Sequence, residues 1–183
     1  MIERLIAFAL LILLSPLCFV ISILIIMEDG FPILYSQKRP GKNHVIFKLS
    51  KFRTMWNDTP EVATHELKHP EDYLLKIGRI IRRLSFDEIP NLINVIKGDI
   101  RFIGPRPALY NQYDLIALRE KYGIDKQKPG ITGWAQVNGR DELDISQKVE
   151  LDKWYLNNRS LSIDIKILYW TFTKSLASSK ISH

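Results

Sequence analysis

The sequence predicts an α-rich α+β fold, in which an apolar N-terminal membrane segment precedes a domain of amphipathic helices with short β-strands. Residues 5–27 form an uncharged run of 23 residues, apolar residues recur at helical spacing in several later segments, and short extended runs lie between turns near residue 40. The chain has 183 residues, 46% of them hydrophobic and 25% charged. This composition is typical of one folded domain and excludes a multidomain protein.

Apart from the apolar start, the chain is basic. The whole chain carries a net charge of +6, and residues 31–183 hold 25 bases against 17 acids. This excess favours an anionic partner, which charge alone leaves open among nucleic acid, anionic lipid and phosphorylated substrate. The single cysteine, Cys18, excludes an internal disulfide or a thiolate metal cluster and is typical of a reducing compartment.

The apolar run Leu5–Met27 is long enough to cross a bilayer. A cleavable signal peptide fits poorly, because no basic cluster precedes the run and no small-residue cleavage site follows it. At its midpoint, Pro16 lacks a backbone donor and predicts a bend, and the Ser15 hydroxyl is expected to help satisfy the freed carbonyl. The length of the apolar run and the tolerance of proline in spanning helices favour a kinked single-pass helix. The alternative is a helix-break-helix hairpin that enters and leaves the membrane by the same face.

The remainder of the chain is predicted to contain short strands followed by helices. Extended segments are expected at 33–36 and 45–49, on either side of a turn at 39–43, and a polar loop at 57–72. A further short strand containing Trp134 is expected between turns at 129–130 and 138–139. Helices are expected at 73–84, 87–97 with a C-cap at Gly98, 110–122, 146–157 and 163–176. The last helix can pack inward or lie in a membrane interface.

A stretch with six cations and no acid follows the apolar run. It spans Phe31–Asn57 and contains Lys38, Arg39, Lys42, Lys48, Lys51 and Arg53. One interpretation is a basic surface that faces water or lipid headgroups, and the other gives one or two of these cations to a phosphate. Strand alternation would place Lys51 and Arg53 on a common face.

Two adjacent acids, Asp87 and Glu88, follow a pair of arginines that begins at Arg82. Ser85 with Glu88 three residues later predicts a capping box, and this purely structural interpretation is favoured by the segment alone. Adjacent carboxylates beside an arginine also suit phosphoryl chemistry. In that case one acid acts as nucleophile or base and another binds Mg²⁺.

Two later segments add candidate ligand contacts. In residues 104–107, a glycine and two prolines fix an irregular backbone around Arg106, whose planar fork of donors suits a diphosphate, although a plain connector is the alternative. In residues 128–140, three glycines surround polar side chains that include Asn138 and Arg140 and permit close approach of a ligand. The chain has no G-K-[ST] signature, which argues against P-loop NTP hydrolysis.

Together these segments resemble the bacterial sugar transferase family, the monotopic polyprenyl-phosphate hexose-1-phosphate transferases that start glycan assembly on a lipid carrier. The resemblance covers nearly the whole chain and is to the small, single-domain members. Its marks, in order, are Ser15-Pro16 in the apolar segment, 47–55, 85–92, 94–99, 104–107 and 129–140. It implies that residues 1–28 form a re-entrant membrane helix-break-helix. Residues 29–183 would then be a cytosolic, membrane-associated catalytic domain on the cytoplasmic face of the bacterial inner membrane.

The resemblance also implies a mechanism. Asp87 would attack the β-phosphate of a UDP-sugar, release UMP and form a covalent aspartyl-phosphosugar, which polyprenyl phosphate then attacks. Glu88, with Asp87, would bind Mg²⁺. The substrate-binding residues would be Lys51, Arg53, Arg82, Arg106, Asn138 and Arg140.

Membrane lipids, downstream glycosyltransferases and a second copy of the chain are the further partners that the resemblance suggests. The competing hypothesis is a membrane-anchored basic module that binds lipid headgroups or nucleic acid without catalysis. No recognised nucleic-acid motif accompanies the basic residues, so we expect no nucleic-acid partner.

Overall fold

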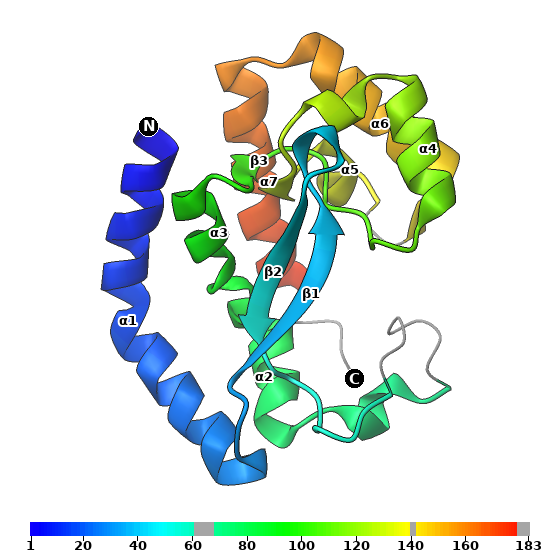
Figure 1. Ribbon diagram of the computed structural model, residues 1–183. Coiled ribbons are helices and arrows are strands. Elements are labelled where there is room, and N and C mark those ends of the chain that lie inside the picture. Colours follow the sequence, from blue (N-terminus) through cyan, green and yellow to red (C-terminus); the bar gives the residue numbers. More distant parts are fainter. Residues whose placement is uncertain (61–67, 140–141, 179–183) are drawn as a thin grey trace.

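A computed structural model describes residues 1–60, 68–139 and 142–178 (Figure 1). It is rich in helix and has a few short strands, as predicted. In chain order the elements are α1 (Ile2–Asp29), β1 (Leu34–Pro40), η1 (Lys42–His44), β2 (Ile46–Phe52), η3 (Pro70–Tyr73), α2 (Lys76–Arg83), η4 (Phe86–Glu88), α3 (Asn91–Lys97), β3 (Arg101–Ile103), α4 (Tyr113–Lys121), η5 (Ile124–Lys126), β4 (Gly130–Thr132), α5 (Trp134–Val137), α6 (Ile145–Asn158) and α7 (Leu161–Ser178).

Helix α1 is a single bent helix that runs along one side of the domain (Figure 1). Pro16 lies inside it and cannot donate to the carbonyl of Ile12, four residues back. The Ser15 hydroxyl donates to this same carbonyl over 2.7 Å, which confirms the predicted compensation. Among the described residues, α1 is the one helix long and apolar enough to cross a membrane.

Both ends of α1 form hydrogen bonds and ion pairs with the same domain. At the start, the Glu3 carboxylate accepts hydrogen bonds from the Arg101 guanidinium, with 2.8 Å between Oε1 and Nη2. At the end, the Glu28 carboxylate accepts hydrogen bonds from the first two backbone N–H groups of α2, at 2.6 and 3.1 Å. The neighbouring Asp29 pairs with the buried Arg53 guanidinium. These contacts, which lie 25 residues or more apart along α1, hold the helix against the domain along its length.

Strands β1 and β2 form an antiparallel hairpin that extends beyond the two predicted segments. In its register Tyr35 lies opposite Lys51, and Arg39 lies opposite Phe47. One face of β2 buries Phe47 and Leu49 in a cluster shared with α1 and α3. Lys51, two residues beyond Leu49, lies on this same face of the strand, but near the end of β2, where its side chain is 23% exposed and is not part of the apolar cluster.

The capping box predicted at Ser85 is absent. Ser85 has a left-handed backbone (φ 57°), its side chain makes no capping bond, and the next residues form the short 3₁₀ turn η4. The regular helix α3 starts only at Asn91, after Pro90, and ends at Gly98 as predicted. Asp87 and Glu88 therefore lie in a 3₁₀ turn between two helices, and the structural explanation for this acid pair, helix capping, is wrong.

The strand predicted around Trp134 is also corrected. Strand β4 ends at Thr132, and Trp134 begins the one-turn helix α5. The Trp134 ring stacks on Trp154 of α6 and Trp170 of α7, with centroids 4.5 and 5.7 Å away. This packing between distant segments sets the local backbone. Strand β4 pairs with β3 in a short parallel ladder.

Candidate active site

The acid pair in η4 meets a lysine from the end of β2. The Lys51 ammonium lies 2.6 Å from Oε1 of Glu88 and 3.4 Å from Oδ2 of Asp87. The two carboxylate side chains are only 13% and 17% exposed. Residues more than 30 positions apart in the chain thus form one largely buried ionic cluster, and the Lys51 cation bridges both acids.

Arg106 reaches the same cluster from the loop at residues 104–107. Its Nη2 lies 3.2 Å from Oε1 of Glu88. The loop is held tightly against β4: a Cβ on Gly130 would lie 2.1 Å from the backbone nitrogen of Gly104, and one on Gly133 would lie 2.1 Å from its carbonyl oxygen. Two of the glycines expected to admit a ligand are therefore needed for the backbone packing that supports Arg106.

The two acids have pKa values displaced in opposite directions. Burial raises the pKa of Asp87, and the nearby Glu88 charge adds to this, while Lys51 and Arg82 oppose it. Burial alone would also raise the pKa of Glu88, but the Arg106 and Lys51 charges outweigh it and lower this pKa to about 2. Adjacent carboxyls with separated pKa values are a feature of catalytic sites, where the two groups have different tasks.

The structure places the other predicted contacts as follows. Arg82 is close enough to Asp87 to influence its pKa, and its Nη2 lies 3.7 Å from Sδ of Met55. Arg53 follows the end of β2, and its guanidinium binds Asp29 and backbone carbonyls near the end of α1 instead of the acid pair. The Asn138 amide donates to the Trp134 carbonyl over 2.8 Å. Arg140 lies outside the described residues.

In the sequence Arg39 is one of six cations with no distinguishing feature, yet the structure brings it to the Arg106 loop. Its Nη1 donates to the carbonyl oxygen of Pro107 over 3.2 Å. Its Nη2 donates to Oε1 of Gln37 over 2.7 Å. The sequence predicted a turn at 39–43, but β1 continues to Pro40, and strand alternation then places Gln37 and Arg39 on one face.

The acid pair has the donor chemistry that Mg²⁺ prefers. Within residues 1–60, 68–139 and 142–178, no three His, Cys, Asp or Glu side chains gather into a metal cluster. Mg²⁺, however, is commonly held by one or two carboxylates, with water and substrate phosphates completing its coordination. Asp87 and Glu88 supply such carboxylates, and the low pKa of Glu88 keeps that group ionised.

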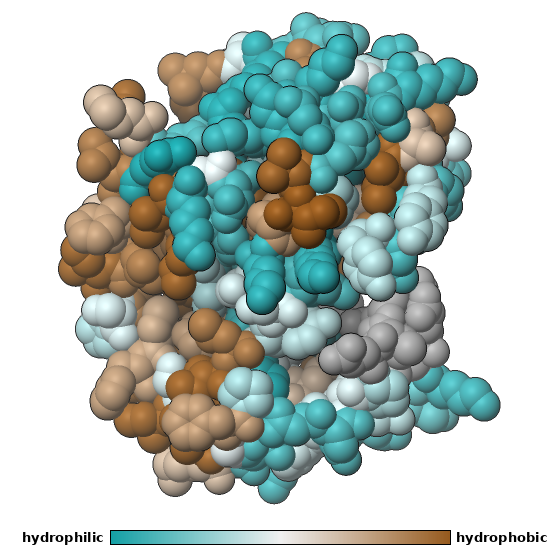
Figure 2. All heavy atoms as spheres, in the orientation of Figure 1, coloured by the Kyte–Doolittle hydropathy of each residue, from teal (hydrophilic) through white to brown (hydrophobic). Residues whose placement is uncertain are grey.

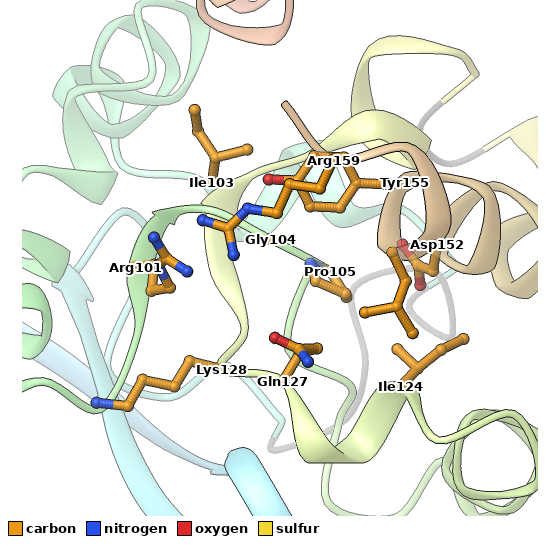
Figure 3. Close-up of a pocket in the computed structure, with 11 residues that line it drawn as sticks. Arg101, Ile103, Gly104, Pro105, Ile124, Gln127, Lys128, Asp152, Tyr155 and Arg159 are labelled. Atoms are coloured by element: carbon orange, nitrogen blue, oxygen red, sulfur yellow. The ribbon is translucent and has the colours of Figure 1, made fainter. Parts of the chain in front are cut away.

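Two hollows of the domain are unsuited to a sugar diphosphate. A cavity of about 10 Å³ between β3 and α6 is lined by Gly104 and Pro105, among others, and has room for about one water (Figure 3). A wider groove of about 420 Å³ lies beside Trp56 and Tyr73. The charged residues described along this groove are all aspartates, which would repel a diphosphate. The cationic cluster at the acid pair is therefore the better candidate for an anionic ligand.

A bent apolar helix fastened at both ends, next to buried acids surrounded by cations, is the arrangement expected of a membrane-associated enzyme that acts on a phosphorylated substrate. Comparison with known proteins supports this class. The chain belongs to the bacterial sugar transferase family, whose profile matches residues 1–178. The resemblance seen in the sequence is thereby confirmed, and the hypothesis of a non-catalytic binding module is not favoured.

Individual relatives agree with this assignment. The chain is 43% identical over 155 residues to a Bacillus subtilis (strain 168) protein named "Uncharacterized sugar transferase EpsL", covering 85% of this chain and 75% of that protein. It is 37% identical over 180 residues to "Undecaprenyl-phosphate glucose phosphotransferase" of Komagataeibacter xylinus, covering 92% of this chain and 34% of that protein. It is 35% identical over 161 residues to "Undecaprenyl-phosphate galactose phosphotransferase" of Salmonella typhimurium, covering 80% and 34%. The chain thus spans only about a third of the length of the last two.

Proposed function

We propose that this protein transfers a sugar-1-phosphate from a UDP-sugar to undecaprenyl phosphate, or another polyprenyl phosphate, and releases UMP. The names of the relatives support undecaprenyl phosphate as the acceptor and a sugar phosphate as the transferred group. The observation that carries the proposal is the largely buried Asp87–Glu88 pair, whose two pKa values are displaced in opposite directions beside Lys51 and Arg106.

In the proposed reaction, Asp87 is the nucleophile. Its carboxylate oxygen attacks the β-phosphorus of the UDP-sugar, and the bond from this phosphorus to the bridging oxygen breaks, so that UMP departs with the electron pair. The sugar phosphate is then an ester of the Asp87 carboxyl. A phosphate oxygen of the lipid acceptor attacks the same phosphorus, which frees Asp87 and gives the polyprenyl-diphosphate-sugar. The burial that raises the pKa of Asp87 makes its carboxylate more basic and hence more nucleophilic.

Glu88 has a different task in this mechanism. Lys51 and Arg106 hold its carboxylate in the ionised form, so it is a poor base and a good ligand for a cation. Asp87 and Glu88 would hold Mg²⁺, which supplies charge neutralisation to the diphosphate when it is bound. Lys51, Arg82 and Arg106 bind and orient the diphosphate, and they stabilise the negative charge that develops as UMP leaves.

We also propose that α1 is re-entrant, so that the protein is monotopic and lies on the cytoplasmic face of the inner membrane. If α1 crossed the bilayer, its two ends would lie on opposite faces. The Glu3–Arg101 pair or the Glu28 and Asp29 contacts would then have to break. A helix that enters and leaves by one face, with its bend at Ser15-Pro16, keeps all of these contacts.

The apolar surface of α1 fits this placement. Figure 2 shows hydrophobic side chains concentrated along the edge of the molecule where α1 lies in Figure 1. Exposed members on α1 include Leu5, Phe8, Ile12, Leu13 and Phe19. Helix α7 buries Ile167 and exposes other apolar side chains, so it both packs inward and offers an apolar face. Covering these surfaces with lipid would remove them from water.

The test is UMP release by the solubilised protein with Mg²⁺, undecaprenyl phosphate and a panel of UDP-sugars. We expect release with one or two donors and a loss of at least about 10³-fold in Asp87→Asn, because the nucleophile is gone. Glu150→Gln, which neutralises an exposed acid on α6, is the matched control and should retain activity. After acid quenching, wild-type protein given a donor labelled at the β-phosphate should retain the label. Full activity in Asp87→Asn would rule out this nucleophile.

A further inference from the structure

Arg39 connects two parts of the candidate site. It lies on β1, and its Nη1 donates to the carbonyl oxygen of Pro107, next to Arg106. Strand β1 is paired with β2, which carries Lys51. The Arg39–Pro107 hydrogen bond therefore ties the hairpin that presents Lys51 to the loop that presents Arg106. Both of these cations contact Glu88.

The Arg39 guanidinium is held in an environment that is unfavourable for a cation. Burial lowers its pKa to about 10, the neighbouring Arg106 charge contributes to this, and Tyr35 and Glu88 only partly oppose it. Its Nε atom is buried and has no hydrogen-bond partner. Two neighbouring guanidinium groups repel each other, and an anion that binds between or beside them relieves this repulsion.

The charges around the acid pair show which anion would balance them. Arg39, Lys51, Arg82 and Arg106 supply four positive charges close to the two negative charges of Asp87 and Glu88. Among these six side chains the excess is two positive charges. The diphosphate of a nucleotide sugar brings about two negative charges at neutral pH, one on each phosphate. The phosphate of a nucleoside monophosphate also brings about two, because its second pKa is near 6.

We propose that Arg39 is a positioning residue for the phosphate groups of the nucleotide, which orients Arg106 through the loop and adds positive charge beside it. This inference rests on the proposed function and deepens it, because it assigns Arg39 to the phosphates and not to the sugar or the base. Loss of Arg39 should therefore weaken binding of UMP and of every UDP-sugar to a similar extent. Binding of uridine, which lacks phosphate, should not change.

The experiment compares the full-length wild-type protein with Arg39→Gln and Arg39→Lys, by calorimetric titration with UMP and with uridine. Arg39→Gln should raise the Kd for UMP about tenfold or more, the size of one lost charge-assisted contact, and leave the Kd for uridine within about twofold. Arg39→Lys keeps the charge but lacks the guanidinium fork, so its Kd for UMP should lie between those of wild type and Arg39→Gln. Lys38→Gln, an exposed neighbour on β1, is the matched control and should bind UMP as wild type does.

The outcomes distinguish a failure of the role proposed for Arg39 from a failure of the proposed transferase function. The inference is overturned if Arg39→Gln binds UMP within twofold of wild type, if it loses UMP and uridine affinity in equal measure, or if Arg39→Lys is as weak as Arg39→Gln. If Arg39→Gln fails to fold in a thermal melt, the Arg39→Lys titration decides alone. If the wild-type protein itself neither binds UMP nor releases it from any UDP-sugar, the proposed function fails, independently of Arg39.

Discussion

The Arg119–Asp152 pair offers a quantitative test of how the Arg106 loop is supported. Arg119 of α4 contacts Oδ2 of Asp152 on α6 through Nη2 at 2.6 Å and Nε at 3.0 Å, and its Nη1 donates to the Arg106 carbonyl over 2.7 Å. The side chains are 12% and 2% exposed. Burial raises the pKa of Asp152 and the Arg119 charge opposes this, so Arg119→Met leaves an unpaired carboxyl in the interior. Such a loss costs about 3–5 kcal/mol.

For a chain of this size, each kcal/mol shifts the thermal midpoint by about 2–4 °C, so Arg119→Met should lower it by about 6–20 °C. Thermal unfolding in detergent micelles measures this shift. Lys121→Met, an exposed cation on the same helix, is the control. Replacing Asp152 by Asn in the Arg119→Met background should recover part of the loss, because the buried charge is then removed. The reasoning is refuted if Arg119→Met melts within 2 °C of wild type, or if the double variant is no more stable.

Two further predictions concern Glu88 and the membrane helix. Because the pKa of Glu88 is about 2 in the folded protein and 4.5 ordinarily, its stabilisation is fully present above pH 4.5 and lost as the pH falls towards 2. Thermal midpoints measured across this range should fall less steeply in Glu88→Gln than in wild type, and parallel curves would contradict the assigned shift. For α1, Ile2→Cys and Phe31→Cys in a Cys18→Ser background should both react with an impermeant maleimide only in inverted vesicles. Labelling of either cysteine in intact spheroplasts would contradict the re-entrant placement.

The sequence predicted those features that depend on local chemistry. The Ser15-Pro16 bend, the Gly98 helix end and the adjacent acids follow from what each residue can or cannot do in a backbone, and the structure contains all three. The capping box failed because a left-handed Ser85 overrides the local pattern. The Trp134 strand failed because stacking on Trp154 and Trp170 fixes that segment, and such contacts between distant parts of the chain leave no periodic signal.

The candidate site shows the same division between local and distant contacts. Asp87 and Glu88 were recognisable as a pair, but their opposite pKa displacements require Lys51 and Arg106, which arrive from separate elements. Period-two alternation places Lys51 on the strand face that carries Phe47 and Leu49, so alternation alone did not indicate that its ammonium meets the acid pair. It could not show that Arg53, two residues later, is engaged by Asp29 at the end of α1. Spacing in the sequence indicated the candidate groups, whereas their environment depends on the tertiary fold.

The contacts of α1 give a physical reason for combining a membrane helix and a cationic site in one unit. Glu28, at the end of α1, accepts hydrogen bonds from the first backbone N–H groups of α2. Helix α2 carries Arg82 and is followed within a few residues by the acid pair. Asp29 fixes the same end of α1 to Arg53, directly after the strand that carries Lys51. Both routes are short, so in the proposed placement the depth of α1 in the lipid would set the height of the acid pair above it. The proposed acceptor carries its phosphate on a polyprenyl chain anchored in the bilayer, so an acid pair held at a fixed height would meet this phosphate by diffusion within the membrane plane alone.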